Sequence, residues 1–224
     1  MLTGRDASTL ESAVSELSAE FGADTVLAFA GDLKSGDAVR KCREFVQDRW
    51  GAPDFVVANI GSARSPGGPV PDVRAWQEAF DVNLWASVRV VQEFLPGMLA
   101  RQSGSVVMVG SIAGSESIAA PLPYSAAKAA LGSWTKNLAR QVGRSGVRVN
   151  LVSPGNIMFD GGSWAQKSAE DPESVRKYLH SEVPLGRFGT PEEIAAVAVF
   201  LCSPRASFIT GARITADGGQ TRSA

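Results

Sequence analysis

The chain alternates short apolar runs with longer segments in which apolar side chains recur every three or four residues. The runs are rich in valine and lack a clean two-residue alternation, which is typical of parallel strands buried on both faces. The expected strands are residues 1–3, 26–30, 55–58, 106–109, 147–152 and 212–216. The expected helices are residues 7–21, 37–50, 72–100 in one or two pieces, 125–142, and a segment that starts at 190. This alternation predicts an α/β fold with a Rossmann-type, doubly wound parallel sheet, in one domain over residues 1–224.

Two segments break the alternation. Residues 61–71 are rich in glycine, proline and serine, and residues 156–188 form a long stretch that includes Trp164 and Tyr178. Segments this long in a compact domain often act as lids or binding loops. The alternative is a mobile surface excursion with a helix of its own. We expect residues 156–188 to be a substrate loop or lid.

Composition and charge narrow the function classes. The formal net charge is -1, so no strong field would attract nucleic acid or an acidic membrane surface. Cys42 and Cys202 are far apart and give neither a disulfide framework nor a metal-ligand spacing, which favours the cytoplasm. The longest apolar run, residues 194–202, is far shorter than the ~20 residues of a membrane span. With His180 as the single histidine, we expect no metal site, no membrane partner and no nucleic-acid partner.

Small or polar residues follow four of the expected strands. They are Asp32, Asn59, Ser111 and the turn at residues 153–155. In an open parallel sheet, ligands bind beyond the carboxyl ends of the strands. These residues are therefore the first candidates for a binding site.

Tyr124 and Lys128 lie four residues apart at a helix start, so both occupy one helical face. A lysine ammonium near a phenol stabilises the phenolate and lowers the tyrosine pKa. A tyrosine tuned in this way exchanges a proton near neutral pH, as carbonyl reduction or alcohol oxidation requires. Ser111 is placed to hydrogen-bond the substrate oxygen as charge develops. The Tyr-x-x-x-Lys spacing alone is common on exposed helices, so the surrounding residues decide its meaning.

Those surroundings strongly resemble the short-chain dehydrogenase/reductase family, in particular its 3-oxoacyl-carrier-protein reductase-like members. Gly110 to Gly114, then Tyr124 to Ala130, match the family in residue type and in the spacing from Ser111 to Tyr124. Further resemblances occur in order along the chain at residues 31–33, 58–61, 81–84, 153–157, 185–193 and 217–219. The resemblance runs from the first residue almost to the last.

The resemblance implies an oxidoreductase that transfers a hydride between NAD(P)(H) and a small-molecule alcohol or ketone. Tyr124 would be the general acid/base, Lys128 would lower its pKa and bind the nicotinamide ribose, and Ser111 would orient the substrate oxygen. Asn83 would hold a water in a proton relay; otherwise it is an asparagine that bonds to backbone at a helix kink. The cofactor residues implied are Arg5, Asp32, Leu33, Asn59, Tyr124, Lys128, Pro154, Gly155 and Ile157. On local sequence, Asn59 equally suits a strand-end turn and Asp32 a helix cap.

Arg5 bears on the choice of cofactor. An acidic residue at this place would bond the ribose diol of NAD, whereas an arginine accommodates the 2′-phosphate of NADP. The family position usually held by the acid is Gly4 here, so NADP is favoured over NAD. The alternative is that Arg5 is a solvated residue near a chain end.

The chain departs from the family in two places. Phe159 stands where a cofactor-contacting threonine is usual. More seriously, the sequence begins at what resembles the end of the family's second strand, without the first strand, glycine-rich turn and helix that would cradle a pyrophosphate. Because that strand is central in the family's order 3-2-1-4-5-6-7, we expect the next two strands to lose their ladder to the fourth. We interpret the sequence as N-terminally truncated, by fragmentation or a misplaced start. An in-frame stop upstream, with no encoded strand–turn–helix, would contradict this.

Other interpretations remain open. The chain is alternatively a catalytically inactive relative that acts as a binding or interaction subunit. A serine hydrolase built on Ser111 and His180 would need a Gly-x-Ser-x-Gly elbow, which residues 110–114 lack. Substrate candidates are a 3-oxoacyl thioester, a sugar, a steroid-like alcohol or a small ketone. The resemblance also implies a homo-oligomer, dimer or tetramer, because many family members assemble through the helices that precede and contain Tyr124.

Overall fold

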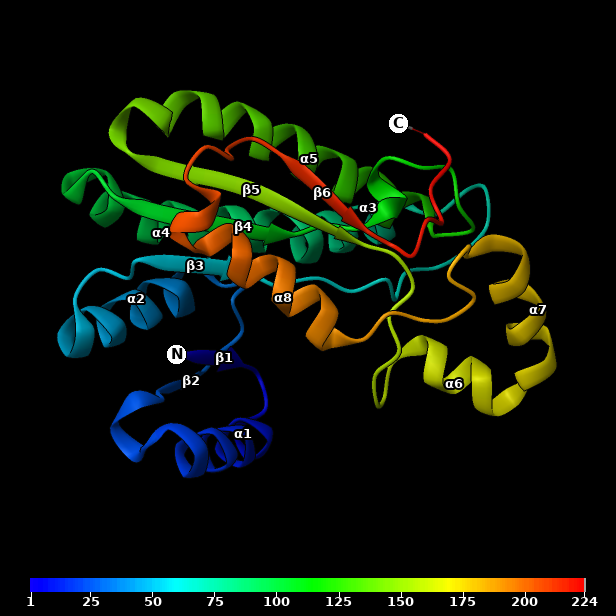
Figure 1. The fold of residues 1–224 in the computed structure, drawn as a ribbon, viewed down its shortest axis with the longest axis horizontal. Coiled ribbons are helices and arrows are strands. Elements are labelled where there is room, and N and C mark those ends of the chain that lie inside the picture. The colour runs from blue at the N-terminus through cyan, green and yellow to red at the C-terminus, as the bar shows by residue number, and fades with distance from the viewer. Residues whose placement is uncertain (224) are drawn as a thin grey trace.

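A computed structural model describes residues 1–223 and shows parallel strands covered by helices (Figure 1). The strands are β1 (Leu2–Gly4), β2 (Ala28–Ala30), β3 (Phe55–Ala58), β4 (Gly104–Val109), β5 (Val147–Pro154) and β6 (Arg213–Ala216). The helices are α1 (Ala7–Phe21), α2 (Gly36–Trp50), α3 (Val73–Phe80), α4 (Ala86–Arg101), α5 (Leu122–Val142), α6 (Ser163–Glu170), α7 (Pro172–Glu182) and α8 (Pro191–Cys202). Strands and helices alternate as the hydrophobic pattern predicts.

The larger sheet has the order β3-β4-β5-β6, all parallel. Its two faces bury different side chains. Val106, Val149 and Leu151 pack with α2, α4 and α5 on one face, whereas Val107 and Val152 pack with α8 on the other. A sheet covered on both faces explains why the strands read as continuous apolar runs. The predicted doubly wound Rossmann-type fold is confirmed.

The first two strands form a sheet of their own. β1 pairs with β2 in parallel, from Leu2 opposite Ala28 to Gly4 opposite Ala30. Within residues 1–223 no ladder joins either strand to β3, as the sequence predicts. Phe55 and Val57 on β3 are 53% and 49% exposed, although both are apolar strand residues. Whether a further segment precedes Met1 stays a prediction.

The segment predicted at 72–100 is a single helical course with a distortion. Asp72 caps α3 by accepting a hydrogen bond from the Ala75 N–H at 2.8 Å. A π-helical turn, Asp81–Trp85, then leads directly into α4. Such turns widen the helix by one residue and are frequent at functional sites. The turn here carries Asn83.

Residues 156–188 contain two helices, α6 and α7, where the sequence predicts a lid or an excursion with a helix of its own. α6 and α7 pack together in the region at the right of Figure 1, and the Trp164 and Tyr178 rings stack with centroids 5.0 Å apart. Asp171 caps α7, and Pro172 occupies its first turn. These start signals were present in the sequence. Both helices are short, with 8 and 11 residues, so each offers few positions at which a helical spacing can be recognised.

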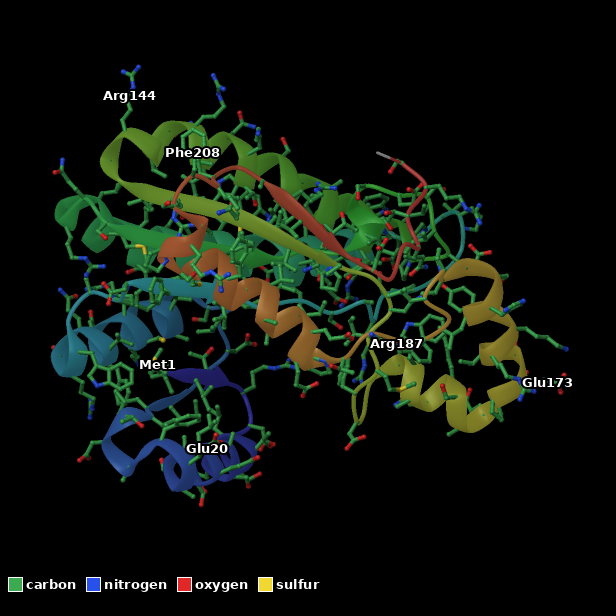
Figure 2. The ribbon with its side chains drawn as sticks, in the orientation of Figure 1. Met1, Glu20, Arg144, Glu173, Arg187 and Phe208 are labelled. Carbon is green, nitrogen blue, oxygen red and sulfur yellow. The ribbon has the colours of Figure 1, made fainter. Side chains whose placement is uncertain are left out.

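α8 begins where the sequence predicts. Thr190 and Glu193 form a reciprocal capping box, and Arg187 pairs with the Glu193 carboxylate through both amino groups, at 2.6 and 2.9 Å. Figure 2 shows Arg187 between α8 and the helices α6 and α7, with Phe208 on the opposite side near the start of β6. Of the helices described in residues 1–223, none has the length and apolar character needed to cross a membrane.

Candidate active site

Lys128 is a buried cation at the carboxyl edge of the larger sheet. It lies in the second turn of α5 and is only 4% exposed. Its Nζ donates to the carbonyl oxygens of Val109, at 2.9 Å, and Ile60, at 3.5 Å. The lysine thus joins the end of β4 to the segment that follows β3. Burial lowers the pKa of Lys128 to about 8, because the charged form loses its hydration.

Tyr124 lies one helical turn earlier, with its ring centroid 5.9 Å from Lys128 Nζ. Burial raises the pKa of the Tyr124 phenol, and a side-chain interaction with Ser111 partly offsets that rise. The sequence predicts the opposite, a Tyr124 pKa lowered by Lys128. Loss of hydration of the phenol is the largest influence on the Tyr124 pKa. The Lys128 amine instead donates to two backbone carbonyls.

Ser111 is fixed by the turn that it caps. Its Oγ accepts a hydrogen bond from the Ala113 N–H at 3.1 Å, at the start of a short 3-10 turn, Ile112–Gly114. Gly114 lies flush against α5, where an added Cβ would come within 2.8 Å of the Lys128 carbonyl oxygen. The missing side chain therefore lets the turn approach the helix and brings Ser111 to Tyr124.

Asn83 is almost fully buried in the π-helical turn. Its amide nitrogen donates to the carbonyls of Ala79 and Ser62, both at 3.0 Å, and its Oδ1 accepts from the Ser62 N–H at 2.9 Å. This is the backbone-bonded arrangement weighed above as the alternative to a water relay. The side chain holds the segment after β3 in place.

Gly61 joins Asn83 to Lys128, a role that sequence reasoning missed. A Cβ added at Gly61 would lie 2.8 Å from both Asn83 Oδ1 and Lys128 Nζ. The two side chains therefore converge on the same point of the backbone. The available signal was a glycine three residues after the end of β3.

A cleft of about 740 Å³ opens beside this cluster. Among the residues predicted to bind cofactor, Arg5, Asp32, Leu33 and Asn59 line it, together with Asn83. Asp32 accepts from the Lys34 N–H at 3.0 Å and pairs with its ammonium at 3.6 Å. The alternative of a helix cap at Asp32 is wrong, because Ser35 caps α2 by accepting from the Ala38 N–H. The structure brings these five predicted residues into one site.

The other predicted cofactor residues lie outside the cleft lining. Gly155 donates its N–H to the Ala216 carbonyl at 3.0 Å, immediately after Pro154 ends β5. Ile157 forms a parallel bridge with Gly189. Backbone pairing at the sheet edge therefore fixes the positions of Gly155 and Ile157. Their contact with a cofactor stays a prediction.

Lys34 and Arg64 line the cleft but were not singled out from the sequence. A basic residue two positions after Asp32 and an arginine within the glycine-rich segment were the signals available. Within residues 1–223, neither Arg5 nor Arg64 has a salt-bridge partner. The same residues contain no group of three or more His, Cys, Asp or Glu side chains placed to hold a metal ion.

The chain is similar to several known proteins along nearly its whole length. A family model described as enoyl-(acyl carrier protein) reductase matches residues 1–221. "Inactive 2-(S)-hydroxypropyl-CoM dehydrogenase 2" of Xanthobacter autotrophicus is 33% identical, over 98% of this chain and 94% of that protein. The 3-oxoacyl-[acyl-carrier-protein] reductase FabG of Vibrio cholerae is 31% identical, over 98% of this chain and 89% of that protein.

Solved structures share the whole fold. An NADPH-bound short-chain oxidoreductase of Pseudomonas aeruginosa, with an atypical catalytic center, superposes with a TM-score of 0.91 at 28% identity, over 100% of this chain and 86% of the other. L-sorbose reductase of Gluconobacter frateurii, complexed with NADPH and L-sorbose, gives 0.91 at 28% identity, over 100% and 87%. With the family model matching nearly the entire sequence, the chain belongs to the short-chain dehydrogenase/reductase family.

Proposed function

We propose that this protein is an NAD(P)-dependent oxidoreductase that interconverts an alcohol and a carbonyl, with Tyr124 as general acid/base. The observation that carries the proposal is the buried Lys128 ammonium, held by two carbonyls beside Tyr124 and next to the cleft. A buried lysine without a carboxylate partner is costly to the fold. Perturbed titratable groups of this kind gather at functional sites.

The residues would divide the work as follows. A bound nicotinamide supplies or accepts the hydride. Because its pKa is raised, Tyr124 is protonated at neutral pH and is ready to donate to a carbonyl oxygen during reduction. Ser111 adds a hydrogen bond to the same oxygen. Asn83 uses both amide protons on backbone carbonyls, so a relay water would bond to the second lone pair of its Oδ1.

The cleft suits a phosphate-bearing cofactor. Its lining holds three basic residues, Arg5, Lys34 and Arg64, and three acidic ones, Asp32, Glu78 and Asp81. Asp32 and Asp81 form salt bridges with Lys34 and Arg89, whereas Arg5 and Arg64 have no salt-bridge partner within residues 1–223 and can meet phosphate charge. The guanidinium of Arg5 favours NADP over NAD, since a guanidinium matches a 2′-phosphate. NADPH is also the cofactor in the two related structures described above, from Pseudomonas aeruginosa and Gluconobacter frateurii.

The substrate is proposed to be a small-molecule alcohol or ketone. Trp164 and Tyr178 stack on each other, and Trp164 also contacts Phe188 at 5.2 Å, so these rings form the core of the lid. Phe159, the departure from the family's threonine, is 53% exposed and remains available to an apolar substrate. Residues 156–188 would then cover the substrate.

Turnover tests the proposal directly. Purified protein is assayed with NADPH and NADH against a panel of 3-oxoacyl thioesters, sugars, steroid-like ketones and small ketones. The expected result is cofactor oxidation with at least one class, lost in Tyr124→Phe. Equal turnover by Tyr124→Phe would show that Tyr124 is not the acid/base.

A second candidate function is a catalytically inactive binding or interaction subunit. Two observations favour it: one relative is itself described as inactive, and β1 and β2 are not hydrogen-bonded to the larger sheet within residues 1–223. Titration with NADPH and NADH separates the candidates. Saturable micromolar binding supports the enzyme, and absence of binding supports the inactive subunit.

We further propose a cytoplasmic homo-oligomer, either dimer or tetramer. Trp85, in the helical course before Tyr124, is 49% exposed, and Phe208 is fully exposed (Figure 2). These two exposed side chains are candidates for an association surface. The free thiols of Cys42 and Cys202 suit a reducing compartment. Light scattering on the purified protein measures the oligomeric state.

A further inference from the structure

The segment after β6 crosses the carboxyl edge of the sheet as a strap, defined here as residues 217–223. The Asp217 carboxylate bends it by accepting from the N–H groups of Gly219, at 2.9 Å, and Thr221, at 2.7 Å. Gly218 and Gly219 both have positive φ, which makes this bend accessible to glycine. Leu185 donates its N–H to the Gly218 carbonyl at 3.1 Å. The strap is therefore fixed at its start to the chain that leaves α7.

In the middle of the strap, Gln220 is buried within a triangle of polar side chains. Its Nε2 donates to the Tyr178 hydroxyl, and its Oε1 accepts from Asn156 Nδ2, both at 2.9 Å. Asn156 Nδ2 also donates to the Tyr178 hydroxyl, at 2.9 Å. Asn156 follows β5, and Tyr178 belongs to α7. Gln220 therefore ties the lid to the sheet edge, and the Trp164 stack extends that tie to α6.

The far end of the strap is bonded to the loop between Ser111 and Tyr124. Glu116 Oε2 accepts from the N–H groups of Arg222 and Ser223, both at 3.0 Å, and from Ser223 Oγ at 2.8 Å. The Arg222 guanidinium also pairs with Glu182, in the last turn of α7, at 3.2 Å. Figure 1 shows the red segment after β6 beside the green loop that leads into α5. One short segment thus contacts both the lid and the loop that carries the proposed proton-transfer residues.

We infer that the strap sets the position of the lid over the active-site loop, with Gln220 and Glu116 as positioning residues for substrate binding. The lid has little apolar core of its own beyond its stacked rings, since the only buried apolar side chains of residues 156–188 are Val175 and Val183. Polar ties must therefore supply much of its order. Segments with few buried apolar contacts open most easily. The expected effect on substrate binding rests on the proposed function, whereas the expected effect on the order of the lid does not.

Hydrogen–deuterium exchange measures the structural consequence without any substrate. Gln220→Leu removes two neutral hydrogen bonds from the triangle, so exchange in residues 163–182 should accelerate roughly tenfold. Exchange in β4 and β5 should not change. Thr221→Ala is the matched control, because its side chain has no hydrogen bond among those found in residues 1–223. Equal exchange in Gln220→Leu and Thr221→Ala would overturn the inference.

Steady-state kinetics measure the functional consequence. Gln220→Leu should raise the substrate KM about tenfold, with kcat and the NADPH Kd changed less than about twofold. Glu116→Ala is a second variant, to be used if Gln220→Leu fails to fold. It lies at a partly exposed position, so it leaves no buried gap, and it should also raise KM. A fall in kcat without a rise in KM would refute the positioning role. If the wild-type protein shows no turnover, the proposed function fails while the exchange result still decides whether the strap orders the lid.

Discussion

The convergence of Asn83 and Lys128 on Gly61 gives the sharpest test of the site. We consider Gly61→Ala, the smallest substitution that fills the space between them. Gly61 does not adopt the positive φ that would strain an alanine, so the effect of the substitution is steric. The new Cβ would lie 2.8 Å from Asn83 Oδ1 and from Lys128 Nζ, well inside the ~3.5 Å of ordinary heavy-atom contact.

Neither neighbour moves freely. Asn83 has three hydrogen bonds to backbone, and Lys128 has two. Overpacking of this kind typically costs about 1–3 kcal/mol of stability. A displacement of about 1 Å at a catalytic group costs on the order of a hundredfold in rate, or about 2.7 kcal/mol of transition-state stabilisation. We therefore expect kcat/KM of Gly61→Ala to fall roughly a hundredfold, because Lys128 and Tyr124 lose their alignment.

The assay compares kcat/KM and the free energy of unfolding with those of Gly67→Ala. Gly67 lies in the same glycine-rich segment, and a Cβ there would meet open space. That variant should behave like the wild type. If Gly61→Ala matched Gly67→Ala in both measurements, the packing of Asn83 and Lys128 around Gly61 would not control the site. Unfolding remains informative even if no substrate is found.

Four further predictions follow from the same contacts. Tyr124→Phe should lower kcat at least about a hundredfold, the usual contribution of a general acid, while NADPH binding measured by fluorescence stays within about threefold. The pKa of Lys128 is lowered to about 8, so the unfolded chain holds more protons above that pH, and stability should rise with pH. Between pH 8 and pH 10, the free energy of unfolding measured in urea should rise by about 2 kcal/mol more for the wild type than for Lys128→Met. If the two proteins showed the same pH dependence, the assigned burial of Lys128 would be wrong. Arg5→Ala should raise the Kd of NADPH about tenfold and leave that of NADH unchanged, and equal weakening would exclude a 2′-phosphate contact. Arg148 donates to the carbonyls of Leu201, Cys202 and Ser203 at the end of α8, so Arg148→Met should lower the free energy of unfolding by about 2 kcal/mol, against no change for the outward-pointing Arg144→Met (Figure 2).

Local sequence signals predicted an element well where the interactions that form it lie within a few residues of one another. The capping box at Thr190 and Glu193 and the cap at Asp72 satisfy orphan backbone groups within a few residues, so the helix starts at α8 and α3 could be read directly. α6 and α7 lie in the segment predicted as a loop or lid, with a helix of its own as the alternative, and their order depends on partners elsewhere in the chain. Tyr178, for example, is held by Asn156 and Gln220.

For the active site too, some features follow from local sequence and others depend on long-range contacts. The sequence by itself determined which residue types occur at the strand ends and the Tyr124–Lys128 spacing, because residue order and helix geometry are local properties. Only the tertiary structure decided the pKa directions at Tyr124 and Lys128, which depend on burial by distant segments rather than on their mutual spacing. It also decided that Gly61 lies between Asn83 and Lys128 and that the strap reaches Glu116, since these contacts join residues brought together only when the sheet and its helices pack.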